Sequence, residues 1–370
     1  MKIEQFNMER MQSTWENVVD YNLSESGVHP LNLQGFLSPA ELADLAKLEL
    51  GYSQTNGTPE LRTEIARLHP GLSPEQVLVT NGSSESNFLL MWSTIESGDE
   101  VLFELPNYMQ IWGLLRAFGA KVKPFWLRES LGWQPDPDEL KKLVTRKTMM
   151  IVLTNPNNPT GAVLSEESTA AIIDLAEKAG AWILADEVYR GAERVGGPTP
   201  SFWGRAAKVI SVNGLSKAYG LPGLRIGWIV APEEVTHKAW PYHDYTTISP
   251  SVLSDRLARI ALTPGTRDKI LARTRAILKA NYPLLESWLN SHGKLFVFHP
   301  PQAGAITFAR YNLKINSTVL VEKLIHDGSV LIVPGDHFEM DHHLRFGFGS
   351  AEKTLAEALK RIDRTLAEVR

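Results

Sequence analysis

The segment SVNGLSKAYGLPGLRIGW, residues Ser211–Trp228, places one lysine between two apolar runs. Lys217 follows the run Val209–Val212, which has the β-branched composition of a buried strand, and it is surrounded by glycine and serine. Arg225 precedes the second strand-like run. An amine in this setting can form an imine when desolvation and neighbouring cations lower its pKa. Taken alone, Lys217 could also be an ordinary surface lysine.

Two other segments place polar residues where strand-like runs end. MMIVLTNPNNPTGAVL, residues Met149–Leu164, passes from an apolar strand into a loop of Asn, Pro and Gly. AWILADEVYRG, residues Ala181–Gly191, ends a strand-like run in Asp186 and has Tyr189 three residues later. Ligand crevices of open α/β sheets form at the carboxyl ends of strands. The alternatives are an aspartate that caps a turn and a half-buried tyrosine.

Together these segments resemble the pyridoxal-phosphate enzymes of fold type I, specifically the class I/II aminotransferase family. The matching motifs occur in the family's order, at Asn157–Gly161 (NNPTG), Asp186–Tyr189 (DEVY) and Ser216–Arg225 (SKxxGxxGxR). The resemblance extends from about residue 52 to residue 345. It implies an α/β fold in which a large domain has a mostly parallel seven-stranded sheet between helices, with a smaller α+β domain beside it.

The resemblance implies a role for each matching residue. Lys217 would hold pyridoxal 5'-phosphate as an internal aldimine and later move a proton between the substrate and the cofactor. Asp186 would keep the pyridine nitrogen protonated, so that the ring accepts electrons. Asn158 and Tyr189 would hydrogen-bond the phenolic oxygen of the ring. Arg225 would pair with the phosphate, which suits a planar guanidinium.

A phosphate site is also expected upstream. The run Gln76–Trp92 predicts a strand, a Gly/Ser turn and a helix, and N–H groups at a helix N-terminus bind anions. Gly82, Ser83 and Ser84 match the family's phosphate loop, although an ordinary serine cap would explain them as well.

Where the family usually has a hydroxyl residue three positions before the lysine, this chain has Gly214. We expect the phosphate contact of that residue to be replaced by Ser216, by Ser83 or Ser84, or by a water molecule.

Three further matches complete the implied site. Tyr108 corresponds to the aromatic ring that stacks on the cofactor, and Arg345 to the arginine that binds the substrate α-carboxylate. Tyr52 corresponds to the tyrosine that reaches the cofactor phosphate of the neighbouring subunit. The resemblance therefore implies a homodimer with composite active sites.

Two stretches of the sequence bear on which substrate side chain the site would bind. Family members that prefer acidic substrates carry a second arginine after the lysine, but Trp240–Ser251 has neither arginine nor lysine and contains Asp244. The N-terminal substrate loop has Glu25 and Ser26. Together with Asn158, we expect these residues to contact the substrate. Two carboxylates would favour a cationic, arginine- or lysine-like amino acid and repel aspartate, unless Glu25 caps a turn and Asp244 is merely solvated.

Length and composition agree with this interpretation. The chain has 370 residues, 43% hydrophobic and 22% charged, which suits roughly two domains. Strand-like and helical runs alternate up to about residue 245, and long charged helices follow. We expect an N-terminal segment (1–40) that joins the small domain, a large cofactor domain (41–250) and a small C-terminal domain (251–370).

Several classes of partner and site are not expected. The net charge of −4 gives no electrostatic reason for nucleic-acid or membrane binding. The first residues are polar and acidic and no apolar run is long enough to span a bilayer, so we expect a cytoplasmic protein. With no cysteine, disulfides and thiolate ligands are excluded, and no metal site is expected.

The implied activity is transamination between an L-amino acid and a 2-oxo acid. The motifs establish carbanion chemistry only, so elimination, decarboxylation, oxidation or cyclisation, as in capreomycidine synthase-like enzymes, remain alternatives. A non-catalytic sensor domain that binds the cofactor is a remote alternative, because no basic helix-turn-helix extension is present and Lys217, Asp186 and Arg345 are retained.

Overall fold

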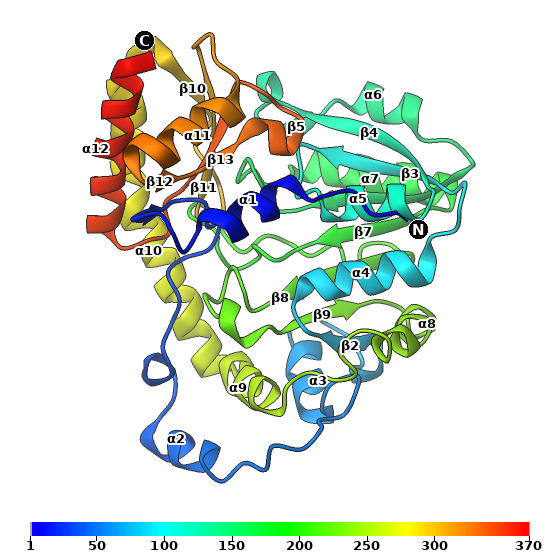
Figure 1. The fold of residues 1–370 in the computed structure, drawn as a ribbon. Coiled ribbons are helices and arrows are strands. Elements are labelled where there is room, and N and C mark those ends of the chain that lie inside the picture. The colour runs from blue at the N-terminus through cyan, green and yellow to red at the C-terminus, as the bar shows by residue number, and fades with distance from the viewer. Residues whose placement is uncertain (1, 370) are drawn as a thin grey trace.

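A computed structural model describes residues 2–369, and its largest feature is an eight-stranded sheet in the order β2-β9-β8-β7-β6-β3-β4-β5 (Figure 1). Its strands are β2 (Val77–Thr80), β3 (Glu100–Leu105), β4 (Lys121–Arg128), β5 (Gln134–Pro135), β6 (Thr148–Thr154), β7 (Trp182–Asp186), β8 (Val209–Gly214) and β9 (Gly227–Val230). Neighbouring strands from β4 to β8 are parallel, and β9 is antiparallel to both β8 and β2. The predicted mostly parallel sheet is confirmed, and the eighth strand is the two-residue edge strand β5.

Helices cover both faces of this sheet. Leu102 and Ile151 point to the face packed by α6 (Pro137–Leu143) and α7 (Glu166–Ala179). Their neighbours Val101 and Met150 point to the other face, which is packed by three helices, α4 (Ser83–Thr94), α5 (Gln110–Ala117) and α8 (Glu233–His243). Successive side chains of a strand alternate between faces, so a strand buried on both sides is apolar throughout.

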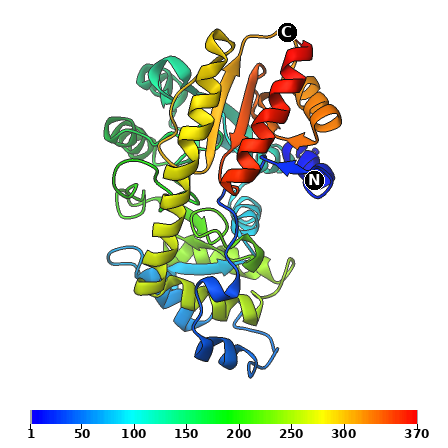
Figure 2. The ribbon, with the colours of Figure 1, turned by 90° about the vertical axis from the view of Figure 1, so that its left-hand side faces the viewer.

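The C-terminal part contains a four-stranded antiparallel sheet in the order β10-β11-β14-β13. Its strands are β10 (Phe296–Phe298), β11 (Ile306–Tyr311), β14 (His343–Gly347) and β13 (Val333–Pro334). The helices of this part are α10 (Pro264–Ser291), α11 (Ser317–Gly328) and α12 (Glu352–Val369). Figure 2 shows the long helix α10 running beside α12.

The N-terminal segment lies against the C-terminal part. Strand β1 (Tyr21–Asn22) pairs in parallel with β12 (Val330–Leu331), residues more than 300 positions apart in the sequence. Helix α1 (Asn7–Trp15) consequently lies between the two sheets in Figure 1. The remaining helices are α2 (Pro39–Leu45), α3 (Pro59–Ala66) and α9 (Val252–Leu262).

The expected elements agree with the structure to within a few residues. Helix α5 begins at Gln110, so Tyr108 lies in the loop before it. The boundaries at residues 40 and 250 remain a prediction. Within residues 2–369, no helix has the combined length and apolar character that crossing a membrane requires.

Candidate active site

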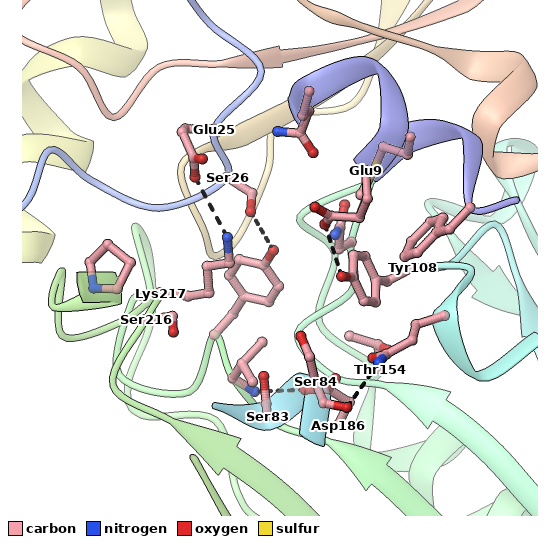
Figure 3. Close-up of a pocket in the computed structure, with 18 of the residues that line it drawn as sticks. Glu9, Glu25, Ser26, Ser83, Ser84, Tyr108, Thr154, Asp186, Ser216 and Lys217 are labelled. Atoms are coloured by element: carbon pink, nitrogen blue, oxygen red, sulfur yellow. Dashed lines mark hydrogen bonds and ion pairs between the residues drawn. The ribbon is translucent and has the colours of Figure 1, made fainter. Parts of the chain in front are cut away.

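A cavity of about 450 Å³ opens where β6, β7 and β8 end. It brings together residues that are far apart in the sequence, as Figure 3 shows. The predicted site residues that line it are Glu25, Ser26, Ser83, Ser84, Tyr108, Asn158, Asp186, Tyr189, Ser216, Lys217, Arg225 and Arg345. Gly82 lies in the turn directly before Ser83, whereas Tyr52 and Asp244 contribute nothing to the cavity of their own chain.

Lys217 forms an ion pair inside the cavity. Its Nζ lies 3.6 Å from Oε2 of Glu25, and the two side chains point toward one another in Figure 3. Burial alone would lower the pKa of Lys217, but Glu25 and then Tyr189 outweigh burial and raise it. The same attraction lowers the pKa of Glu25. The expected lowering of the lysine pKa is therefore wrong for this arrangement, because a carboxylate is its nearest charged neighbour.

Asp186 ends β7 at the bottom of the cavity. Its carboxyl is buried and accepts a hydrogen bond from the backbone N–H of Val188 at 3.1 Å. Burial raises the pKa of Asp186 to about 6. A buried carboxylate of this kind is stabilised by a cationic partner that enters the cavity, as a protonated ring nitrogen would.

The turn before α4 forms an anion-binding corner. Gly82 has φ of 83°, and a Cβ on it would lie 2.4 Å from Nη2 of Arg225. A Cβ on Gly227 would lie 2.3 Å from the backbone N of Ser83. Glycine at both positions thus lets the turn pack on β9 with the guanidinium against it. The free N–H groups at the start of α4, the serine hydroxyls and Arg225 together suit a phosphate.

The structure explains why the chain has glycine at position 214. Gly214 pairs with Gly227 across β8 and β9, and a Cβ on Gly214 would lie 2.9 Å from the carbonyl O of Ile226. Any side chain at this position would press against the neighbouring strand. The hydroxyl groups of Ser83, Ser84 and Ser216 line the cavity instead.

Arg345 is buried on β14, and its guanidinium donates hydrogen bonds to two oxygen atoms. Nη1 donates to Oδ1 of Asn158 at 2.8 Å, and Nη2 donates to the carbonyl O of Ser24. Its Nε is buried and has no hydrogen-bond partner within residues 2–369. A carboxylate bound in the cavity could satisfy this donor.

Tyr189 and Tyr108 are both fixed by hydrogen bonds that they donate to N-terminal residues. Tyr189 donates to Oγ of Ser26 at 2.8 Å, and Tyr108 donates to Oε1 of Glu9 at 2.8 Å. Burial raises the pKa of each phenol. Both phenols therefore stay protonated and can act as hydrogen-bond donors.

Helix α1 and the residue that follows it contribute three polar side chains to the cavity that the sequence motifs did not predict. Glu9, Gln12 and Glu16 line the cavity, and their spacing of three and four residues places them on one helical face. Burial, followed by the charges of Glu25 and Glu9, raises the pKa of Glu16. The three carboxylates are thus close enough to repel one another. The spacing of Glu9 and Glu16 along one helical face is recognisable in the sequence, but their position at the cavity is not.

Asp244 and Tyr52 lie elsewhere. Asp244 is the exposed residue that follows α8, so the expectation that it faces the substrate is not met within one chain. Tyr52 is 86% exposed. The acidic wall of the cavity consists of Glu9, Glu16 and Glu25 instead.

The family model for aminotransferase class I and II matches residues 37–362. The chain belongs to this family. Among its relatives, capreomycidine synthase of Streptomyces vinaceus is 31% identical over 93% of this chain and 89% of that protein. A PLP-dependent aminotransferase from Streptococcus suis has 33% identity and a TM-score of 0.94, covering 100% of this chain and 99% of the other. The PLP-dependent cyclase OrfR has 27% identity and a TM-score of 0.91, covering 100% and 98%.

Class I and II aminotransferases depend on pyridoxal 5'-phosphate, and the cavity of this member suits it. The corner at Gly82 suits an anion, and among residues 2–369 no cationic side chain forms an ion pair with the buried carboxyl of Asp186. Lys217 supplies the amine that the cofactor's aldehyde requires.

Proposed function

We propose that this protein is a PLP-dependent aminotransferase that exchanges the amino group of an L-amino acid with a 2-oxo acid. One observation carries the proposal. The amine of Lys217, the carboxyl of Asp186 and the guanidinium of Arg345 line the same cavity, which has an anion-binding corner beside it. When bound, the cofactor supplies an electron sink that labilises the bonds of a substrate's α-carbon.

The residues of the chain divide the remaining work. Arg345 would bind the α-carboxylate of the substrate and so orient its Cα–H bond. Lys217 would hold the cofactor and, once released from it, its Nζ would move the proton of the substrate's α-carbon. Asp186 would hold a proton on the cofactor's ring nitrogen, and Asn158 and Tyr189 would hydrogen-bond its ring oxygen. Tyr108 packs as the aromatic wall.

We further propose that the substrate side chain is cationic. Glu9, Glu16 and Glu25 face the cavity, and within residues 2–369 none of the three forms an ion pair with an arginine. In the structure the ammonium group of Lys217 pairs with the carboxylate of Glu25. Once the amine of Lys217 is bonded to the cofactor, this ion pair would be lost. Glu25 is then free to attract an ammonium or guanidinium group, whereas a substrate carboxylate would be repelled.

A second candidate is a PLP-dependent cyclase, lyase or oxidase of an arginine-like amino acid. The similarity to capreomycidine synthase, at 31% identity, and to the cyclase OrfR, with a TM-score of 0.91, favours it. The two candidates share every binding step and differ only in what happens after the α-carbon has lost its proton. The cavity residues alone therefore support both.

We also propose a cytoplasmic homodimer in which Tyr52 reaches the partner's cavity. Its 86% exposure, beside Leu50 at 74%, leaves this segment available to a second copy. Mixing the Tyr52→Phe and Lys217→Ala variants tests this. Hybrid dimers hold one site free of both substitutions, so activity above that of either variant is expected, and no gain would contradict the shared site.

The visible spectrum of the purified protein tests the reaction. Addition of arginine or ornithine should bleach the absorption band of the bound cofactor, and a 2-oxo acid should restore it. Bleaching that a 2-oxo acid does not reverse, with release of ammonia, hydrogen peroxide or a cyclic product, would favour the second candidate. If aspartate or an aromatic amino acid reacts faster than arginine and ornithine, the proposed cationic preference is wrong.

A further inference from the structure

A buried histidine–glutamate pair lies behind the anion-binding turn and has no part in the proposed reaction. His243 is the last residue of α8 and is 0% exposed. Its Nε2 lies 3.1 Å from Oε2 of Glu85, the third residue of α4. Neither residue lines the cavity.

Both ring nitrogens of His243 face oxygen atoms that accept. Nδ1 lies 2.8 Å from the carbonyl O of Thr55, which has no proton to offer. Nε2 faces the Glu85 carboxylate and Oγ1 of Thr247, and the hydroxyl of Thr247 donates its own proton to Glu85 at 2.7 Å. A neutral imidazole has only one N–H group, whereas an imidazolium donates to Thr55 and to Glu85 at the same time.

Glu85 is negatively charged in this setting. Burial opposes its ionisation, but hydrogen bonds from His243, Thr246 and the backbone N–H of Asn81 outweigh burial and lower the pKa of Glu85 to about 2. Asn81 directly precedes the turn Gly82–Ser84. An uncompensated carboxylate here would weaken the attraction between the N-terminus of α4 and a phosphate dianion.

We propose that His243 is a positioning residue that, as an imidazolium, cancels the charge of Glu85 so that the turn Gly82–Ser84 can hold a dianionic phosphate. The inference rests on the phosphate site in the proposed function. The same ring also ties the turn to Thr55, whose hydroxyl accepts from Nε1 of Trp240 at 2.8 Å. The pair thus joins the phosphate corner to the segment that carries Tyr52.

Binding titrations of full-length, cofactor-free protein test this, with pyridoxal 5'-phosphate and with pyridoxal, which lacks the phosphate. His243→Gln should weaken binding of the phosphorylated form on the order of tenfold and leave pyridoxal binding unchanged, because an unbalanced charge acts on the phosphate alone. The double variant Glu85→Gln/His243→Gln, which is neutral again, should restore affinity for pyridoxal 5'-phosphate. Equal weakening for both ligands, or no recovery in the double variant, would overturn the inference.

Glu85→Gln alone decides the matter should His243→Gln fail to fold. The inference expects Glu85→Gln to bind pyridoxal 5'-phosphate at least as tightly as wild type, whereas a purely structural pair would lose affinity in either single variant. If wild-type protein binds pyridoxal as tightly as pyridoxal 5'-phosphate, the proposed phosphate site fails and this inference fails with it. Failure of the variants alone leaves the proposed function intact.

Discussion

Nζ of Lys217 and Oε2 of Glu25 lie 3.6 Å apart in the cavity, although the two residues are 192 positions apart in the sequence. Glu25 follows β1, which the pairing with β12 holds beside the C-terminal sheet. One carboxylate thus stabilises the charged form of the amine and also faces the space where a substrate side chain would lie. In the proposed function, Glu25 therefore affects both the binding of the cofactor and the choice of substrate.

The first prediction concerns the pH dependence of cofactor capture. Burial lowers the pKa of Lys217, but Glu25 raises it above its usual value, and only the neutral amine attacks an aldehyde. Capture of pyridoxal 5'-phosphate by cofactor-free protein should speed up as the pH rises, and Glu25→Gln should shift that rise to lower pH. Stopped-flow absorbance measures it. An unchanged profile in Glu25→Gln would mean that this ion pair does not control the amine.

The second prediction separates the acidic wall from the exposed aspartate. Glu16→Gln should lower kcat/KM for arginine by about tenfold, because it removes one carboxylate that faces a cationic side chain. The value for the uncharged norleucine should change little. Asp244→Asn is the matched control and should behave as wild type, since Asp244 is exposed outside the cavity. A larger effect of Asp244→Asn than of Glu16→Gln would restore the expectation from the sequence.

The third prediction concerns Asp186, whose replacement should stabilise the cofactor-free protein and reduce its activity. Its pKa is raised from 3.8 to about 6, so folding favours the protonated form. Protonated Asp186 therefore adds to the free energy of unfolding below about pH 4. This stabilisation is lost as the pH rises through 6, a change of roughly 3 kcal/mol in the free energy of unfolding. Cofactor-free Asp186→Asn should therefore unfold at higher urea concentration than wild type at pH 8, with little difference at pH 4.

The same substitution should strongly reduce transamination, because an amide cannot hold the ring nitrogen's proton. The exposed Asp174, which pairs with Lys178 on α7, provides the control. Asp174→Asn should show neither effect. If Asp186→Asn destabilises the protein at pH 8, burial of the ionised carboxyl does not lower the stability of the wild-type protein.

The fourth prediction concerns the α-carboxylate. Arg345→Lys keeps the charge but loses the planar pair of donors, so kcat/KM should fall roughly 10- to 100-fold for every amino acid, whatever its side chain. Arg310→Lys, on the exposed side of β11, should leave the kinetics unchanged. A loss confined to cationic substrates would assign Arg345 a different role.

The motifs around Lys217 predicted the large sheet and most of the cavity, because short-range patterns place these residues at strand ends. Residues that reach the site through tertiary contacts were harder to predict. Glu9 and Glu16 enter the cavity only because β1 pairs with β12, and no local pattern encodes that pairing. Asp244 was expected at the site by its position in the sequence, but it directly follows α8 and is exposed outside the cavity.

Gly214 illustrates the same limit. The missing hydroxyl was visible in the sequence, whereas its cause, the close approach of Ile226 on the way into β9, required the packed strands. The raised pKa of Lys217 likewise depends on Glu25, which lies on a distant segment.

The most direct test of the central claim is the visible spectrum of two variants of Lys217 after incubation with pyridoxal 5'-phosphate. Lys217→Arg keeps a cation beside Glu25 but has no primary amine, and Lys217→Ala removes both. If Lys217 carries the cofactor, the absorption band of the lysine-bound form should be absent in both variants, while wild-type protein shows it and loses it on addition of an amino acid. A band of unchanged position and intensity in Lys217→Arg and Lys217→Ala would contradict the account.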